Sequence, residues 1–366
     1  MPLRDDVEQI IRFWDAHERA RGGRSIIDYD FAPTTAEIIP AASRLDVYER
    51  LSELLLQAQA SGAGRIAETL TAHRAYLRSV LGERPPLEQY IRETQGCSAA
   101  GWSADYVTSV GERARVAIEG QGVRWGPRTN EDLIQVEKPI DLTDARDRVL
   151  DVAAEAEPAF RALTGSTSVY NVKIEIHDVD DYWAYWVDGA GNDVRLRFNT
   201  RQATFTEVRL RHFVLHEILG HGLQCATYAD KATDDVDWVR LSSVNLPYQV
   251  LLEGLAQAIP LFVAPDDAPL ITRVRIEHYE QLVRAELHIM INGGSTVAEC
   301  AAHARARIPG GRAAPSRTSW PTAAPTRSSG PTCGPTPPGS TGSLPCTTPA
   351  TRRSSARSYA ERSSDR

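Results

Sequence analysis

Residues 210–230 read LRHFVLHEILGHGLQCATYAD, and this stretch decides how the whole chain is interpreted. It contains a His-Glu pair, His216 and Glu217, and a second histidine, His221, five residues after the first. On an α-helix, residues four apart lie about 40° apart around the axis, whereas residues five apart lie about 140° apart. A regular helix therefore cannot turn both imidazoles toward one point. An extra residue looped into the turn, a π-bulge, restores a shared face, and we expect Gly220 to provide the backbone freedom for it.

The residue types around this pair are those that bind zinc. A catalytic zinc ion takes three protein ligands, histidine nitrogens or carboxylate oxygens, and keeps a fourth position open. We expect His216 and His221 to supply two. Glu253 is the only charged residue in the apolar run LPYQVLLEGLAQAIPLFV, residues 246–263. Because an unpaired carboxylate is costly to bury, we expect Glu253 to be the third ligand. Glu217 is then placed to act as general base on the attacking water.

Interpretations of these residues without a metal site, or with other ligands, remain open. A His-Glu pair with a later histidine also arises by chance, and Glu253 could pair with a buried arginine instead of a metal. His212 lies four residues before His216, the helical spacing of a metal pair, but that pairing would exclude His221. Cys225, four residues after His221, could face a metal, although a small buried thiol is the commoner role.

The segment HEILGHGLQ followed by LLEGLAQ resembles the HExxxH metallopeptidases, a branch of the gluzincin zinc peptidases that includes the tubulin tyrosine carboxypeptidases. Its GH-x-LQ ending is also similar to uncharacterised bacterial helical peptidases. The resemblance covers residues 190–265. It implies Zn²⁺ as cofactor, His216, His221 and Glu253 as its ligands, and Glu217 as catalytic base. It also implies a peptide or protein substrate, with a carboxypeptidase as one form. In zincins a strand before the metal helix binds the substrate backbone, and NDVRLRFNT, residues 192–200, occupies that place.

The rest of the chain predicts an α+β fold that is mainly α-helical. Up to residue 165, apolar residues recur at three- and four-residue steps, which predicts helices over 7–22, 43–62, 64–82 and 143–165. Apolar residues alternate over 169–179, and two further strands flank the turn-like segment 188–193, so a small antiparallel sheet is expected before the metal helix. Further helices are expected from near 204, from 245–247, over 269–291 and from near 295. We divide the chain into an N-terminal helical region, 1–165, and a sheet with the zinc-binding helical region, 166–308.

The composition and charge of the chain indicate which partners and which cellular compartment to expect. The chain carries 41 basic and 48 acidic residues, a net charge of -7, so no nucleic-acid partner is expected. Asp5, Asp6 and Glu8 interrupt the segment where a signal peptide would be apolar, and no membrane partner is expected. The five cysteines are scattered, without a disulfide framework. We therefore expect a cytoplasmic protein with reduced thiols.

Residues 309–366 differ in character from everything before them. They contain ten prolines, eight arginines and a single leucine, so the composition predicts a disordered tail. A basic tail for nucleic acid is one alternative. Our preferred hypothesis is a frameshift near Pro309. One possible codon sequence for Pro331–Thr336, read one base earlier, encodes Tyr-Leu-Trp-Ala-Tyr, which is a sequence typical of a protein core. Gluzincins commonly take an oxyanion-stabilising Tyr or His from this part of the chain. We therefore expect impaired peptidase activity, restored by the alternate frame, with a non-catalytic zinc-binding or scaffold protein as the alternative function.

Several other residues are weaker candidates. His278, Tyr279 and His288 could stabilise an oxyanion or bind a product, and Arg273, Arg275 and Arg284 could bind a terminal carboxylate. For each of them a packing position or a solvated helix face is the commoner role. Trp183 and Trp186 are expected to pack the sheet, and Asp234, Asp235 and Asp237 to form a charged loop.

Overall fold

The computed structural model describes residues 2–181, 183–243 and 245–308. The segment 309–366, with the frameshift and tail hypotheses that concern it, lies outside the described residues. Within the described part, helices predominate and the strands form one small sheet and one two-stranded pair, which confirms an α+β class that is mainly helical.

The N-terminal half is mainly helical, and its first three helices share one apolar cluster. These are α1 Pro2–Ala20, α2 Arg44–Ala60, α3 Gly64–Val80, α4 Leu87–Gln95, α5 Ala104–Gly120, α6 Thr129–Val136 and α7 Leu142–Thr164. Ser43 and Ser103 accept backbone N–H groups at the starts of α2 and α5, as N-caps do. Trp14 of α1 packs, fully buried, with Leu51 of α2 and Leu70 of α3. The four predicted helices are confirmed, and α4, α5 and α6 are additional.

Five strands form the main sheet, in the order β3-β5-β4-β1-β7. Their bounds are β1 Tyr29–Asp30, β3 Asn171–His177, β4 Tyr185–Ala190, β5 Asp193–Asn199 and β7 Leu241–Ser242. The tight turn between β4 and β5 makes this pair antiparallel, but β3 and β5 are parallel, as are β1 and β4. The sheet is therefore mixed, and the expectation of an antiparallel sheet is wrong. The connection from β3 to β4 is long enough to skip one position, which β5 then fills.

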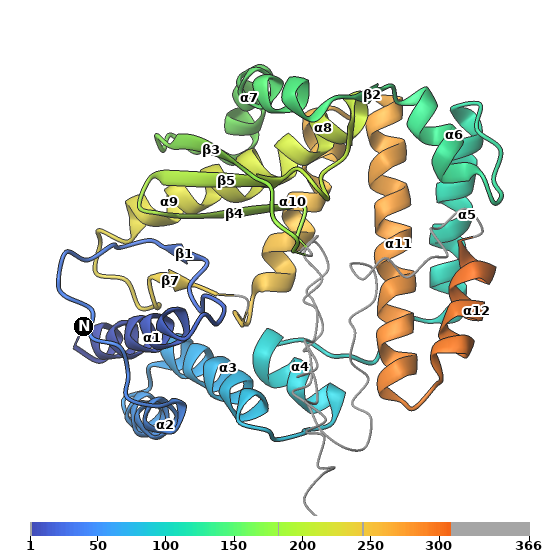
Figure 1. Cartoon of the computed structure of the whole chain (residues 1–366). Helices are drawn as coiled ribbons and strands as arrows, with labels where there is room; N and C mark the ends of the chain where they lie inside the picture. The colour runs from blue at the N-terminus through green and yellow to red at the C-terminus, as the bar shows by residue number, and fades with distance from the viewer. Residues whose placement is uncertain (1, 182, 244, 309–366) are drawn as a thin grey trace, which may run out of the picture.

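One face of this sheet holds the helix that carries the two histidines. Val194, Leu196 and Phe198 of β5 are buried, and they alternate with the more exposed Arg195 and Arg197. The buried face packs on a continuous helical segment made of α8 Glu207–Val214, η1 Leu215–Gly222 and α9 Leu223–Lys231. In Figure 1 this segment runs behind the strands. Beside it, β2 Pro139–Ile140 and β6 Phe205–Thr206 form a separate pair. The sheet therefore fixes the position of the η1 helix.

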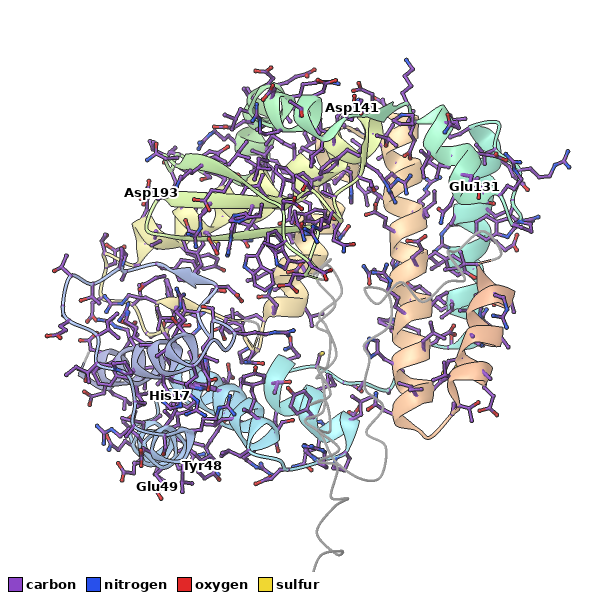
Figure 2. The ribbon with its side chains drawn as sticks, viewed as in Figure 1. His17, Tyr48, Glu49, Glu131, Asp141 and Asp193 are labelled. Atoms are coloured by element: carbon purple, nitrogen blue, oxygen red, sulfur yellow. The ribbon has the colours of Figure 1, made fainter. Side chains whose placement is uncertain are left out.

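The remaining helices complete the described chain. They are α10 Gln249–Val263, α11 Ala268–Asn292 and α12 Val297–Arg307, close to the predicted bounds. α10 packs on η1, while α11 contacts α8, α5 and α12 (Figure 1). Figure 2 shows Asp193 at the start of β5 and Glu131 on α6 at opposite sides of the molecule, with α10 and α11 between them. No helix among the described residues is long and apolar enough to cross a membrane.

Candidate metal centre

The segment Leu215–Gly222 is a π-helix, which confirms the predicted distortion of the helix. It extends over eight residues, with α-helix on both sides, so it is longer than a single bulge. Because hydrogen bonds of a π-helix join residues five apart, side chains at that spacing lie on one face. The Nε2 atoms of His216 and His221 are 3.1 Å apart. The shared face expected from the spacing is present.

Glu253 reaches the two imidazoles from α10. Its Oε2 atom lies 3.5 Å from Nε2 of His216 and 3.3 Å from Nε2 of His221. With the 3.1 Å between the nitrogens, these atoms form a nearly equilateral triangle. Tetrahedral zinc with bonds of about 2.0–2.1 Å requires neighbouring ligand atoms to be about 3.3 Å apart. The two nitrogens and one carboxylate oxygen therefore fit a zinc ion in both chemistry and spacing.

Close packing of η1 on α10 brings Glu253 into this position. A Cβ atom on Gly220 would lie 2.8 Å from Cβ of Ala256 and 2.9 Å from Cδ1 of Ile259. Gly220 precedes His221, and Ala256 follows Glu253 by three residues, so this contact sets the separation of the two ligands. Gly220 has no left-handed φ. The glycine is thus required for close approach of the helices, and the expected need for backbone freedom is not what the structure uses.

The carboxylate of Glu253 accepts a hydrogen bond through one oxygen and faces the imidazoles of His216 and His221 through the other. Gln249, one turn earlier in α10, donates a hydrogen bond from Nε2 to Oε1 of Glu253 over 2.8 Å. Oε2 of Glu253 and Nδ1 of His216 are buried and have no hydrogen-bond partner among the described residues. An unsatisfied buried carboxylate oxygen is costly. A cation between Oε2 and the imidazoles would remove that cost.

The Glu253 carboxylate and the neighbouring imidazoles stabilise one another electrostatically. Burial alone would raise the pKa of Glu253, but the imidazoles of His221 and His216 outweigh it and hold that pKa well below its usual range. Burial would likewise lower the pKa of His221, but Glu253 and then Glu217 raise it above the ordinary value. Without a metal, a protonated His221 therefore pairs with the Glu253 carboxylate.

Glu217 is a second buried carboxyl beside the cluster. Donor atoms of His216, Glu217 and His221 all lie within 4.8 Å of one another, so Glu217 too is within reach of a shared ion. However, its Oε1 is 3.9 Å from Nε2 of His216, farther than Oε2 of Glu253. The shorter contacts favour Glu253 as third ligand and leave Glu217 for proton transfer. Burial raises the pKa of Glu217, which brings this carboxyl closer to the range of a useful general base.

Two alternative candidates have other partners. His212, the alternative to His221, pairs through Nδ1 with Glu277 of α11 at 3.1 Å. Arg273, a candidate for binding a substrate carboxylate, is 2% exposed and donates from Nε to Glu137 over 2.9 Å. A buried guanidinium bound to a buried carboxylate cannot receive a substrate. The interpretation of Arg273 as a substrate-binding residue is therefore wrong.

The other weaker candidates are distributed over the fold. Tyr279 donates its hydroxyl hydrogen to the carbonyl of Arg307, 3.0 Å away between α11 and α12. Burial, with a smaller contribution from Asp28, raises the pKa of Cys225 to about 12, so it stays a thiol. Three candidates on α11 are exposed, namely Arg275, His278 and Arg284. His288 of α11 is partly buried, as are Trp183 and Trp186 in the sheet region. Asp235 and Asp237 form ion pairs with Arg4 and Arg65, and Asp234 lies in the same loop.

Among the residues that the structure describes, part of β4 has an open edge, whereas β5 has none. β5 pairs with β3 along one edge and with β4 along the other, so the expectation that residues 192–200 bind the substrate backbone is wrong. β3 occupies the edge that a substrate would need. β4, in contrast, is covered by β1 only at Gly189 and Ala190. Within the described ranges, Trp186, Val187 and Asp188 have a strand neighbour on one side only. β4 also contacts η1, the helix that carries His216 and His221.

The sequence interpretation missed Gln249 and Glu277. The helical spacing of four between Gln249 and Glu253 could have indicated the first, whereas nothing in the sequence pairs Glu277 with His212. No protein-family model, no curated protein and no solved structure matches the chain. The assignment of a function therefore depends on the site itself.

Proposed function

We propose that the protein is a zinc-dependent peptidase of the gluzincin type. The observation that carries the proposal is the triangle of His216 Nε2, His221 Nε2 and Glu253 Oε2, with edges of 3.1, 3.3 and 3.5 Å. The unsatisfied Oε2 atom gives it a second support. A metal here explains why the chain buries a carboxylate in an otherwise apolar helix, because a cation offsets the cost of burying a negative charge.

The chain's own residues would divide the chemistry among them. A zinc ion in the triangle supplies Lewis acidity toward a peptide carbonyl and toward water. Glu217 accepts a proton from the attacking water and delivers it to the leaving amine, a role that its raised pKa favours. Gln249 keeps Glu253 oriented through the 2.8 Å hydrogen bond. The open edge of β4 binds the main chain of an extended peptide by strand addition. This strand edge favours a peptide over other hydrolysable substrates.

Substitution of Glu217 separates the metal site from the chemistry. We expect Glu217→Gln to keep zinc at the wild-type ratio and to abolish cleavage of a peptide mixture, measured by mass spectrometry beside metal analysis. Glu131→Gln, an exposed residue of α6 on the side of the molecule opposite Asp193 (Figure 2), is the matched control and should leave both readouts unchanged. Retained cleavage, or loss of zinc from Glu217→Gln, would show that the roles of Glu217 and Glu253 are misassigned.

The alternative is a metal-binding protein without catalytic activity. It would be favoured by a wild-type protein that holds one zinc per chain and cleaves no peptide in the mixture. We also propose a cytoplasmic location, which the free thiols of Cys97, Cys225 and Cys300 support.

A further inference from the structure

The open edge of β4 ends abruptly at β1. β1 runs parallel to β4, with Tyr29 opposite Gly189 and Asp30 opposite Ala190. The backbone N–H of Asp28 donates to the carbonyl of Ser242 over 2.9 Å, which holds residue 28 in line with β1. An extended chain paired with Trp186–Asp188 would therefore run into Asp28. A substrate on this edge must end there or turn away.

Asp28, the residue just before β1, carries an acidic side chain at the end of this edge. No side chain among the described residues donates a hydrogen bond to the carboxylate of Asp28, whereas the neighbouring Asp188 receives Arg195 and Arg197. The pKa of Asp28 is raised to about 7, chiefly by burial and then by the charges of Asp188, Asp15 and Glu253, against a smaller lowering by Arg197. One of the charges that act on Asp28 is that of Glu253, the third expected metal ligand. The end of the β4 edge is therefore an acidic position that a cationic group would stabilise.

Charge selects the direction of a peptide at this position. A peptide antiparallel to β4 would bring its amino end to Asp28, and its ammonium group would complement the carboxylate. A parallel peptide would bring its terminal carboxylate to Asp28, and Asp188 and Glu253 would add to the repulsion. The antiparallel direction is favoured.

We propose that Asp28 binds the free α-amino group of a peptide lying antiparallel on the Trp186–Asp188 edge of β4, and that the enzyme is an aminopeptidase. This inference rests on the proposed peptidase function and specifies its substrate class. It differs from the carboxypeptidase form of the sequence-based expectation. Blockage of the β4 edge by β1 limits cleavage to bonds near the amino end, because the chain cannot continue past Asp28.

Cleavage of matched peptides tests the inference. The full-length, zinc-loaded protein is incubated with ten-residue peptides that carry either a free or an acetylated amino terminus, and products are identified by mass spectrometry. We expect residues to be released from the amino end of the free peptides, and the acetylated forms to react about tenfold to a hundredfold more slowly, the range of one hydrogen bond to a charged group. Internal or carboxy-terminal cleavage, or equal rates for the two forms, would overturn the inference while leaving the peptidase proposal intact.

Substitution of Asp28 assigns the preference to this side chain. Asp28→Asn should raise KM for the free peptides by the same factor and leave the acetylated peptides unaffected. Asp193→Asn, in the β4–β5 turn beyond the residues of β4 that β1 covers, is the matched control and should change neither (Figure 2). An unchanged preference in Asp28→Asn, with an unaltered melting temperature, would contradict the role of Asp28.

A binding measurement tests the inference even if the protein cleaves no peptide. In the zinc-loaded Glu217→Gln protein, calorimetry compares trialanine with N-acetyl-trialanine. Tighter binding of trialanine, lost in the Asp28→Asn double variant, supports the site even if wild-type turnover is absent and the peptidase proposal fails. Equal binding of the two peptides would refute it.

Discussion

Replacement of Gly220 by alanine tests the helix contact that positions the metal ligands. The new Cβ atom would lie 2.8 Å from Cβ of Ala256 and 2.9 Å from Cδ1 of Ile259, closer than real Cβ contacts allow. Since the neighbour at 2.8 Å is itself a Cβ atom fixed to the backbone, η1 and α10 must separate. Overpacking of this kind costs about 1–3 kcal/mol. Because His221 and Glu253 lie beside this contact, we expect zinc affinity to fall together with stability.

Two further variants make the interpretation specific. Gly254 lies in α10, and a Cβ atom added there meets nothing within 4 Å. Gly254→Ala should therefore stabilise the protein by about 0.5–1 kcal/mol. Ala256→Gly added to Gly220→Ala removes the nearest clash and should restore zinc affinity. Urea unfolding of the metal-free protein and zinc competition with a chelator provide the two readouts. A Gly220→Ala protein with wild-type stability and affinity would refute the close-packing explanation.

Three further predictions concern the surroundings of the site. Gln249→Leu should weaken zinc binding about 10–100-fold in the chelator assay, because Glu253 loses its orienting hydrogen bond; unchanged affinity would exclude that role. The raised pKa of His221 contributes stability to the metal-free protein that is fully present below the ordinary value of 6.5 and is lost as pH rises through the raised value. The difference in unfolding free energy between wild type and His221→Ala should therefore shrink as pH rises, and a constant difference would count against the pairing. Arg273→Ala should destabilise the protein by about 3–5 kcal/mol in thermal unfolding, since Glu137 is left buried and unpaired; reduced activity in a fully stable variant would instead restore Arg273 as a substrate-binding residue.

The local features of the site were predictable because they are encoded at short range. The five-residue spacing of His216 and His221 requires a π-helix if both imidazoles are to share a face, and the structure contains one. The isolated charge of Glu253 in an apolar helix indicated a buried partner. In the structure Glu253 lies close to both imidazoles, as that expectation requires. The identity of the partner as a metal ion stays a prediction.

The pairing of distant elements was not predictable from the same patterns. Alternation in β3 and β5 shows which side chains face the core, but it does not show which strands are neighbours. β1 is two residues long, too short for any periodicity, yet it closes the β4 edge. Arg273 looked like one more charge on a helix face, because its partner Glu137 is 136 residues away in sequence. Sequence patterns report burial and local geometry, whereas these contacts depend on tertiary structure.

The most direct measurement is the zinc content of the purified full-length protein and of single-ligand variants after dialysis. Wild type should retain one zinc per chain, and His216→Ala, His221→Ala and Glu253→Ala should each lose it, while Cys225→Ala keeps it. Wild-type zinc content in Glu253→Ala or His221→Ala would contradict convergence of the three side chains on one ion.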